Sequence, residues 1–552
     1  MAAVLQACDA GVIRSTRTSV TCQPSSRPWV LAAASLGSGM AFLDSTVMNV
    51  ALPAVQADLG ASARQVQWAY GAFALVLSAL ILVGGTLGDR FGRRRLFVFG
   101  AAVFGAGSLW CALAPDPGQL VAARAVQGVG GALLVPASLA IVGASFEGKQ
   151  RTKAIGAWGA LSGLAMAVGP VLGGWLVDEV SWRAAFLITP AMAVVAVPIA
   201  LWHVRESRDP EARRLDLVGA ILATSGLAGL VYALIESSTL GPGSPRVLAA
   251  LMLGVIALSA FVFVERRTKD PMVPPTLFHS RSFAGANLVT LLFYMGLTGS
   301  LYFLPFLMMQ VHGYSAFASG SVFLPFVAMA LLIGRLSGRI CERFGAKVPL
   351  IVASLAIAVG LLLFALPGAE HGSYWTSFFP AMVVQGFGMA LAITPLTTVA
   401  LGSVEGEHSG LAAGVNNAVA RVAGLLAVAV LGVLVYGAFS ASLDARLEGM
   451  DLPGGSRSAM EAAKADLGAA QAPEGVDART EARIEGAIAE SFVAGFRAVM
   501  LAAAGLAFAS ALVAALLVGD KRVPSASSNP ARRLGAGGHE SFWNPERAPL
   551  VP

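Results

Sequence analysis

Long apolar stretches separated by short polar segments run along almost the whole chain. A helix needs about 20 apolar residues to cross a bilayer. Runs of that kind occur near 29–50, 67–87, 96–114, 120–143, 154–177, 184–202, 215–235, 247–264, 283–309, 317–337, 348–366, 375–400, 410–437 and 492–518. The pattern therefore predicts an all-α polytopic membrane protein with fourteen spans.

Composition and charge support this prediction. Of the 552 residues 56% are hydrophobic and only 13% charged, with a mean hydropathy of +0.71, whereas soluble proteins carry roughly 25% charged residues. Lysine and arginine gather in every second loop, at 90–95, 149–153, 205–214, 266–269, 339–347 and 521–522. The positive-inside rule places these loops and both termini in the cytoplasm. We expect a protein of the cell membrane, and the net charge of +6 does not indicate a nucleic-acid partner.

One loop recurs in altered form, which indicates two related halves. Residues 85–94 (GTLGDRFGRR) match residues 338–347 (GRICERFGAK) without a gap. The first copy follows the second span, but the second copy follows the tenth, so two spans are inserted between the halves. We expect a cytoplasmic tail at 1–28, a six-helix bundle at 29–204 and two inserted helices at 205–265. A second six-helix bundle follows at 266–518, with an extracytoplasmic loop at 440–490, and a disordered cytoplasmic tail at 519–552.

Four motifs carry a resemblance to a known family. They are the repeated loop, Leu43–Pro53 in span one, Arg124–Gly130 in span four and Gly159–Gly174 in span five. Together with fourteen spans they resemble the major facilitator superfamily, and within it the fourteen-span drug:proton antiporters, which are multidrug exporters. The resemblance implies two six-helix bundles plus two central helices. It also implies alternating access, a monomer, and a proton gradient instead of a cofactor. The cargo would be hydrophobic small molecules, cationic ones included, such as drugs or antibiotics.

Asp44 and Arg124 are charged residues inside apolar runs. A carboxylate at the bilayer centre costs roughly 2.5–3.5 kcal/mol on insertion scales, so Asp44 is the candidate proton site or the counter-charge of a cationic substrate. The alternative is a buried hydrogen-bonding residue near Pro53. The resemblance implies proton coupling for Arg124, whose alternative is to extend to the outer surface. Asn49, Gln127 and Arg421 are further candidates for proton coupling or substrate contact, although Arg421 fits the cavity and the inner interface equally well.

The repeated loop is the candidate cytoplasmic gate. Its glycines allow helices to approach closely, and its acid can cap a helix or pair with an arginine. We expect it to latch the two halves, with simple topogenic charge as the alternative. The residues concerned are Gly85, Gly88, Asp89, Arg90, Gly92, Arg93 and Arg94, and in the weaker second copy Glu342 and Arg343.

Small residues in span five predict a tight, bendable interface between the halves. The resemblance alone makes this pattern an exporter motif. It consists of Gly159, Gly163, Gly169, Pro170, Gly173 and Gly174.

Two other functions compete with export. An uptake carrier, or a lipid or metabolite carrier of the same fold, would share the spans and differ in direction. A polytopic membrane enzyme would need a nucleophile, a metal cluster or a phosphate loop, and the sequence contains no P-loop and no Gly-x-Ser-x-Gly motif. The four cysteines have no metal-ligand spacing, so we expect no metal and no enzyme.

Overall fold

The computed structural model describes residues 24–209, 216–268, 271–369, 373–403, 409–448, 450, 456–473 and 476–519. The tails expected at 1–28 and 519–552 lie mostly outside these residues. Within them the protein is helical, and fourteen helices are long and apolar enough to cross a membrane. The prediction of an all-α, fourteen-span membrane protein is confirmed.

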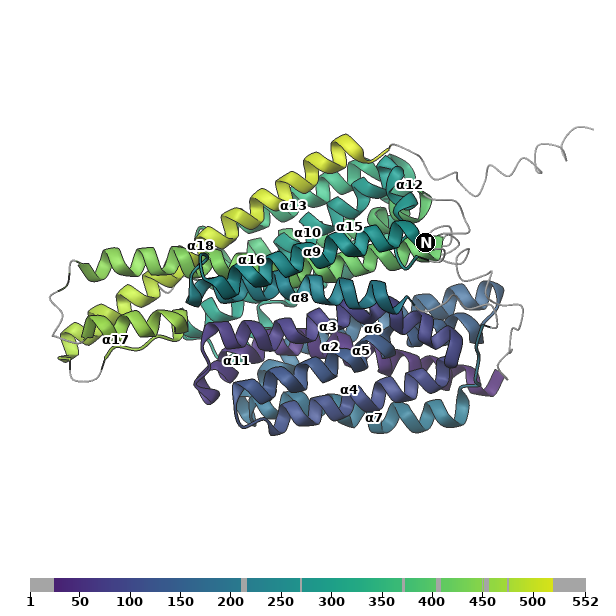
Figure 1. Cartoon of the computed structure of the whole chain (residues 1–552), viewed down its shortest axis with the longest axis horizontal. Coiled ribbons are helices and arrows are strands. Elements are labelled where there is room, and N and C mark those ends of the chain that lie inside the picture. Colours follow the sequence, from purple (N-terminus) through teal and green to yellow (C-terminus); the bar gives the residue numbers. More distant parts are fainter. Residues whose placement is uncertain are drawn as a thin grey trace, which may run out of the picture.

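The first six helices form one bundle, the lower one in Figure 1. Short capped turns join them: the Ser62 side chain accepts the Gln65 amide, and Asp116 accepts that of Gln119. These bonds satisfy amides that a helix start leaves unpaired. After the short η1 (Pro24–Ser26), the bundle comprises α2 (Arg27–Leu59), α3 (Ala63–Phe91), α4 (Arg93–Leu113), α5 (Pro117–Ser145), α6 (Gly148–Glu179) and α7 (Trp182–His203).

The last six spans form the second, upper bundle of Figure 1. The span expected at 317–337 is not one helix, because α11 (Ala316–Ser321) and α12 (Leu324–Phe344) are separated at residues 322–323. Pro325 opens the second piece, where its missing amide is tolerated. The other spans are α10 (Arg281–Phe306), α13 (Lys347–Phe364), α15 (Phe379–Gly402), α16 (Ser409–Glu448) and α18 (Ala478–Leu517); the short elements are η2 (Pro275–His279), η3 (Leu307–Val311) and α14 (Tyr374–Ser377).

The two inserted helices, α8 (Leu217–Leu240) and α9 (Pro245–Arg267), lie between the bundles in Figure 1. α8 contacts α3 of the first bundle and α16 of the second, and α9 packs on α8. Glu236, near the end of α8, is only 7% exposed. Its carboxylate accepts from Arg64 Nη1 at 2.6 Å and from Trp68 Nε1 at 3.0 Å. This pairing joins α8 to the start of α3.

The segment expected as a loop at 440–490 is partly helical. α16 continues to Glu448 and α18 begins at Ala478, so residues 478–490 are the first turns of α18. Both helices project beyond their bundle at the left of Figure 1. Both helices can continue here because each has a buried apolar face, which includes Leu443, Leu447 and Ile484. The polar residues of the two helices lie on the other face, toward water. Such amphipathic ends contain no continuous apolar run that would mark them in the sequence.

Two short elements lie between these projections, α17 (Ser456–Ala463) and η5 (Lys464–Ala469). The Lys464 ammonium pairs with Asp444 at 2.7 Å and with Glu461. Burial lowers the pKa of Lys464, but the two carboxylates outweigh it and raise that pKa above its usual value. These ion pairs hold the start of η5 in place. The backbone carbonyl of Asp466, also in η5, accepts a hydrogen bond from Gln56 Nε2 of the first bundle at 3.0 Å.

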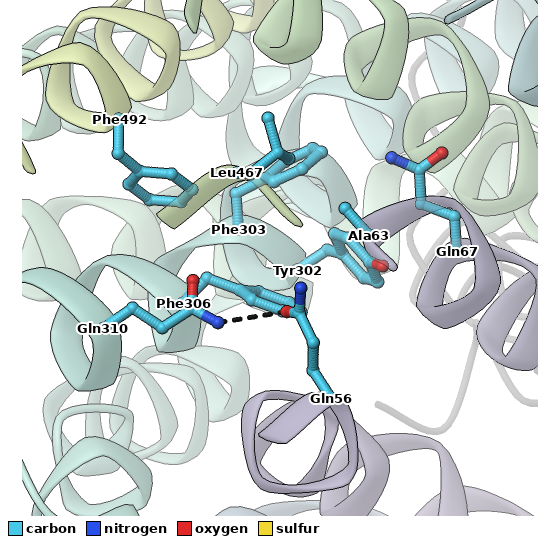
Figure 2. Close-up of a pocket in the computed structure, with 9 residues that line it drawn as sticks. All are labelled: Gln56, Ala63, Gln67, Tyr302, Phe303, Phe306, Gln310, Leu467 and Phe492. Atoms are coloured by element: carbon cyan, nitrogen blue, oxygen red, sulfur yellow. Dashed lines mark hydrogen bonds between the residues drawn. The ribbon is translucent and has the colours of Figure 1, made fainter. Parts of the chain in front are cut away.

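The two ends of the molecule differ in how the bundles meet. We call the end that carries both repeated loops the basic end, and the other the opposite end. At the opposite end the Asp178 carboxylate accepts the amides of Ala316 and Phe317 at 2.9 and 2.7 Å. Figure 2 shows Gln310 donating to Gln56 across the same seam, at 3.0 Å. The bundles are therefore closed together at the opposite end.

Candidate functional site

Three buried side chains form a hydrogen-bonded group, which we call the central cluster: Asp44, Arg124 and Gln127. Arg124 Nη1 donates to Asp44 Oδ2 and to Gln127 Oε1, both at 2.6 Å. Gln127 Nε2 donates to the other carboxylate oxygen, Asp44 Oδ1, at 2.7 Å. Asp44 is 5% exposed and the other two residues 0%. A carboxylate and a guanidinium are thus held together, buried, within the first bundle.

The Arg124 guanidinium has further partners outside the central cluster. Its Nε donates to the Ala69 carbonyl at 3.2 Å, and it lies 4.3 Å from the Phe73 ring centroid. This full burial excludes the alternative in which Arg124 extends to the surface. A guanidinium offers several donors in a fixed plane, so one side chain can serve three acceptors.

The local sequence explains why these side chains meet. Arg124 and Gln127 are three residues apart on α5, and so share a face of the helix. Gly107 and Gly128 let the neighbouring helices come close: a Cβ on Gly107 would lie 2.9 Å from the Gln127 amide nitrogen, and one on Gly128 2.9 Å from the Phe73 carbonyl. The glycines around Gln127 therefore set the depth at which α5 packs against α3 and α4.

Asn49 is not part of the central cluster. It is partly buried, and its Oδ1 has no hydrogen-bond partner among the described residues. Five residues separate it from Asp44, which turns its side chain well away from that of Asp44 on a 3.6-residue helix.

A cavity of about 160 Å³ adjoins the central cluster, and we call it the central cavity. Arg124 lines it from the first bundle and Arg421 from the second. The Nε of Arg421 is buried and has no hydrogen-bond partner among the described residues. The remaining lining residues are Ser45, Tyr70, Phe73, Ala74, Leu77, Ser78, Thr298, Ala420, Gly424 and Leu425.

A second cavity, of about 290 Å³, shares Ala420 with the first. It lies among α10, α15 and α16, toward the basic end, and is lined by Tyr294, Thr397, Asn416 and Asn417 together with aliphatic residues. Asn416 donates to Thr290 Oγ1 at 2.8 Å, which fixes one polar group at its edge. The two cavities extend from the centre of the molecule toward the basic end, away from the closed seam.

The first repeated loop binds within its own bundle. Asp89 Oδ1 accepts from Arg93 Nε and Nη2 at 3.0 and 2.7 Å. The amides of Arg94 and Arg95 donate to the Glu206 carboxylate at 3.0 and 3.2 Å. These contacts tie α3 and α4 to the segment after α7. The expected latch between halves is absent from the described contacts of this loop, because the bundles are held together at the other end.

Glu206 was missed by the sequence analysis. It caps the free amides at the start of α4, where the helix dipole favours a negative charge. Gly92 makes room for it: a Cβ there would lie 2.6 Å from Glu206 Oε1, and its φ of +112° favours glycine. The only sequence signal was a single acid between Arg205 and Arg208 after the sixth span.

The other loop residues have simpler surroundings. A Cβ on Gly88 would meet Leu96 at 3.4 Å and one on Gly85 would meet Pro136 at 3.9 Å, both ordinary contacts. Arg90 is exposed beside the Phe91 ring. In the second copy Glu342 and Arg343 are exposed, with no hydrogen bond or ion pair to any described residue.

The span-five motif divides into a packed and an open part. A Cβ on Gly173 would lie 2.9 Å from Val47 of α2, and one on Gly174 would lie 2.8 Å from the Phe317 Cα of the other bundle. Gly169 is equally tight against Thr46, and the Pro170 carbonyl lies against Gly320 of α11. A Cβ on Gly159 or Gly163, nearer the basic end, would meet no atom within 4 Å. Of these six residues, Pro170 and Gly174 meet the second bundle, whereas Gly169 and Gly173 pack against α2 of their own bundle.

The family model described as Major Facilitator Superfamily matches residues 34–428, from α2 into α16. The chain belongs to this superfamily. The multidrug resistance protein Stp of Mycobacterium tuberculosis is 35% identical over 424 residues, 76% of this major facilitator and 78% of Stp. The tetracenomycin C resistance and export protein of Streptomyces glaucescens is 32% identical over 520 residues, 93% and 96% of the two chains.

The solved structures agree on the fold of this major facilitator. A bacterial homologue of the human lysosomal transporter Spinster superposes with a TM-score of 0.62 at 18% identity, covering 91% of this chain and all of that one. The expected fold, a major facilitator with fourteen spans, is confirmed. The protein is a multi-pass membrane protein of a transporter family.

Proposed function

We propose that the protein is a proton-coupled exporter of hydrophobic small molecules such as drugs or antibiotics. It acts as a monomer by alternating access, without a cofactor, in the cell membrane with its basic end and termini in the cytoplasm. The observation that carries the proposal is the Asp44–Arg124 ion pair, buried in the membrane beside a cavity that both bundles line. Intramembrane charges of this kind mark ion and substrate pathways.

The ion pair supplies a way for a proton to act on conformation. Protonation makes the Asp44 carboxyl neutral, whereas Arg124 stays charged at any physiological pH. A buried guanidinium that loses its counter-charge is costly, by about 3–5 kcal/mol where such pairs have been broken. A conformation that gives Arg124 water or another acceptor is then favoured, so proton binding shifts the balance between two states. Asp44 is the proton site and Arg124 a positioning residue.

The direction of transport rests on three supports. The lysine- and arginine-rich loops indicate that the basic end is cytoplasmic. The cavities extend toward that end while the opposite end is closed, so a cargo from the cytoplasm can reach the central cavity. Relatives named for multidrug resistance and for antibiotic export favour outward movement.

Inverted membrane vesicles test the proposal directly. With a preformed gradient, acid inside and followed by an acridine dye, addition of tetracenomycin C to vesicles with the wild-type protein should collapse part of the gradient. Asp44→Asn should not respond, whereas Asp58→Asn should, because Asp58 is a half-exposed carboxylate at the end of the same helix. Proton exchange by Asp44→Asn at the wild-type rate would refute the proton site. Proton-driven accumulation in right-side-out vesicles would instead identify an uptake carrier.

A further inference from the structure

The charges around the central cavity do not balance. Arg124 is neutralised by Asp44, whose two carboxylate oxygens are both occupied within the central cluster. Arg421, on the facing wall, has no ion pair or hydrogen bond to any described residue. The described lining of the cavity contains no other acid or base. The cavity together with Asp44 therefore carries one net positive charge, and that charge is on Arg421.

Arg421 cannot remove this charge by extending to the membrane surface. It is twelve residues past the start of α16 at Ser409, which is roughly 18 Å along the helix at 1.5 Å per residue. That depth is near the middle of a hydrocarbon core of about 30 Å. The guanidinium also stays protonated when it is buried. A cation at this depth is stabilised chiefly by an anion that enters the cavity.

From these observations, and resting on the proposed function, we propose that Arg421 is the anchor for a carboxylate, so that the cargo is an amphipathic organic anion. A planar guanidinium pairs with a carboxylate through two parallel hydrogen bonds. Tyr70 and Thr298, which also line the cavity, have hydroxyls without a hydrogen-bond partner among the described residues. They can donate to the same group.

The adjoining space suits the rest of such a molecule. The second cavity, of about 290 Å³, begins at Ala420, next to Arg421, and most of its wall is aliphatic or aromatic. Its polar groups are those of Tyr294, Thr397, Asn416 and Asn417. A ring system could lie there with its carboxylate on Arg421. Ligand sites commonly combine an apolar wall with a few polar groups in this way.

The inference replaces the cationic cargo that Asp44 alone suggested. Both Asp44 oxygens already accept a hydrogen bond and its charge is paired with Arg124, and the charge of Arg421 repels a cation. Proton and cargo would then occupy different side chains, Asp44 and Arg421, on two bundles that move relative to each other. Their exchange would depend on the shared conformational change and not on direct competition for Asp44.

Three compounds that share one ring system and differ in charge test the anchor: 1-naphthoate, 1-naphthamide and 1-naphthylmethylammonium. Binding is measured by calorimetry on the full-length protein in phosphatidylcholine nanodiscs. The wild-type protein should bind the naphthoate at least tenfold more tightly than the amide, and the ammonium most weakly. Arg421→Gln should reduce the preference for naphthoate to less than twofold, and Arg421→Lys should keep part of it. Arg446→Gln, an exposed arginine of the same helix, should change nothing.

Two results would overturn the inference: no preference for the carboxylate in the wild type, or an undiminished preference in Arg421→Gln. Nanodiscs that also contain phosphatidylglycerol separate cargo from lipid. Preference for naphthoate should persist there, and its disappearance would make Arg421 a lipid headgroup site instead.

Measuring proton exchange distinguishes a failure of the anion anchor at Arg421 from a failure of the proposed export function. In liposomes with a pH gradient, Arg421→Gln should still exchange protons for the naphthamide and lose exchange for the naphthoate. Equal loss of both would overturn the anion anchor. If the wild type exchanges neither these compounds nor tetracenomycin C for protons, the proposed function itself is wrong.

Discussion

At the scale of single residues, the central cluster is a closed set of hydrogen bonds. Every polar atom of the Asp44 and Gln127 side-chain ends has a partner inside it, and Arg124 adds a bond to the α3 backbone. A buried ion pair is stable only when its geometry satisfies both groups in this way. The cluster therefore responds strongly to the loss of one charge and weakly to the loss of both.

Arg124→Gln should lower the free energy of unfolding by about 3–5 kcal/mol, because Asp44 is left charged and unpaired in the bundle. The double variant Asp44→Asn/Arg124→Gln should recover more than half of that loss, since two amides can bond each other. Both are measured by thermal unfolding of purified protein in detergent. Additive losses in the double variant would show that the two side chains are not coupled.

Substitution of Gly92 tests whether the first repeated loop depends on its packing against Glu206. Gly92→Ala should cost about 1–3 kcal/mol, because φ is +112° there and the new methyl would press on Glu206. The expected result is faster trypsin cleavage at Arg93–Arg95 in inverted vesicles, as the start of α4 loosens. Gly402→Ala, also at the basic end and with open space around it, should leave the cleavage rate unchanged.

Among single residues, those that could be predicted from the sequence are charges that stand inside an apolar run. Asp44 and Arg124 could be selected because lipid makes an unpaired charge costly, although their direct pairing could not be read from positions eighty residues apart. Glu206 and Asp178 were missed for the opposite reason. Acids are common in polar segments, and only the folded chain shows that these two cap helices across space.

At the scale of elements, α6 is packed along one half and open along the other. The packed half, residues 169–174, is as close as backbone against backbone allows, and the open half has free space at Gly159 and Gly163. Alternating access requires the bundles to rock about the seam. The open glycines are then where the partner bundle would arrive when the basic end closes.

Gly163→Leu separates folding from transport. It should leave thermal stability within about 0.5 kcal/mol, because no atom lies within 4 Å to be displaced, yet it should slow export at least tenfold by holding the basic end apart. Gly505→Leu is the matched control, since α18 also has open space at that glycine. It should retain normal export measured in inverted vesicles. Wild-type export by Gly163→Leu would show that this face never closes.

Element prediction was accurate for the spans and poor where helices leave the membrane. Fourteen runs of apolar residues identified fourteen helices, since lipid demands both apolar side chains and internal hydrogen bonds. The extensions of α16 to Glu448 and of α18 back to Ala478 lack such runs, and only one face of each is buried. The break before α12 at residues 322–323 was hidden because apolar residues continue through it.

At the scale of the whole molecule, the two bundles meet at one end and leave space at the other. The repeat along the sequence shows that there are two halves, but their relative tilt depends on contacts between distant residues. Gln56 with Gln310, and Asp178 with the start of α11, are such contacts. No local sequence pattern predicts these contacts, so the sequence does not show which end of the molecule is closed.

Locking this seam should stop transport. In a variant without cysteines, Gln56→Cys and Gln310→Cys joined by a short bis-methanethiosulfonate reagent should abolish export, and a reductant should restore it. Each single-cysteine variant treated with the same reagent should keep transporting. Export that continues through the cross-linked pair would show that the opposite end need not open.

The α8–α9 hairpin covers one side of the boundary between the two bundles. α8 is pinned to α3 through Glu236 and Arg64, and its other side meets α16 through apolar residues such as Val231 and Leu425. If the bundles rock as proposed, we expect the ion pair to hold the hairpin to the first bundle and α16 to move against the apolar face of α8. We therefore expect the hairpin to cover this side of the seam between the bundles. On the proposed alternating access, we expect a cargo dissolved in the bilayer to enter between the bundles on the side that the hairpin leaves uncovered.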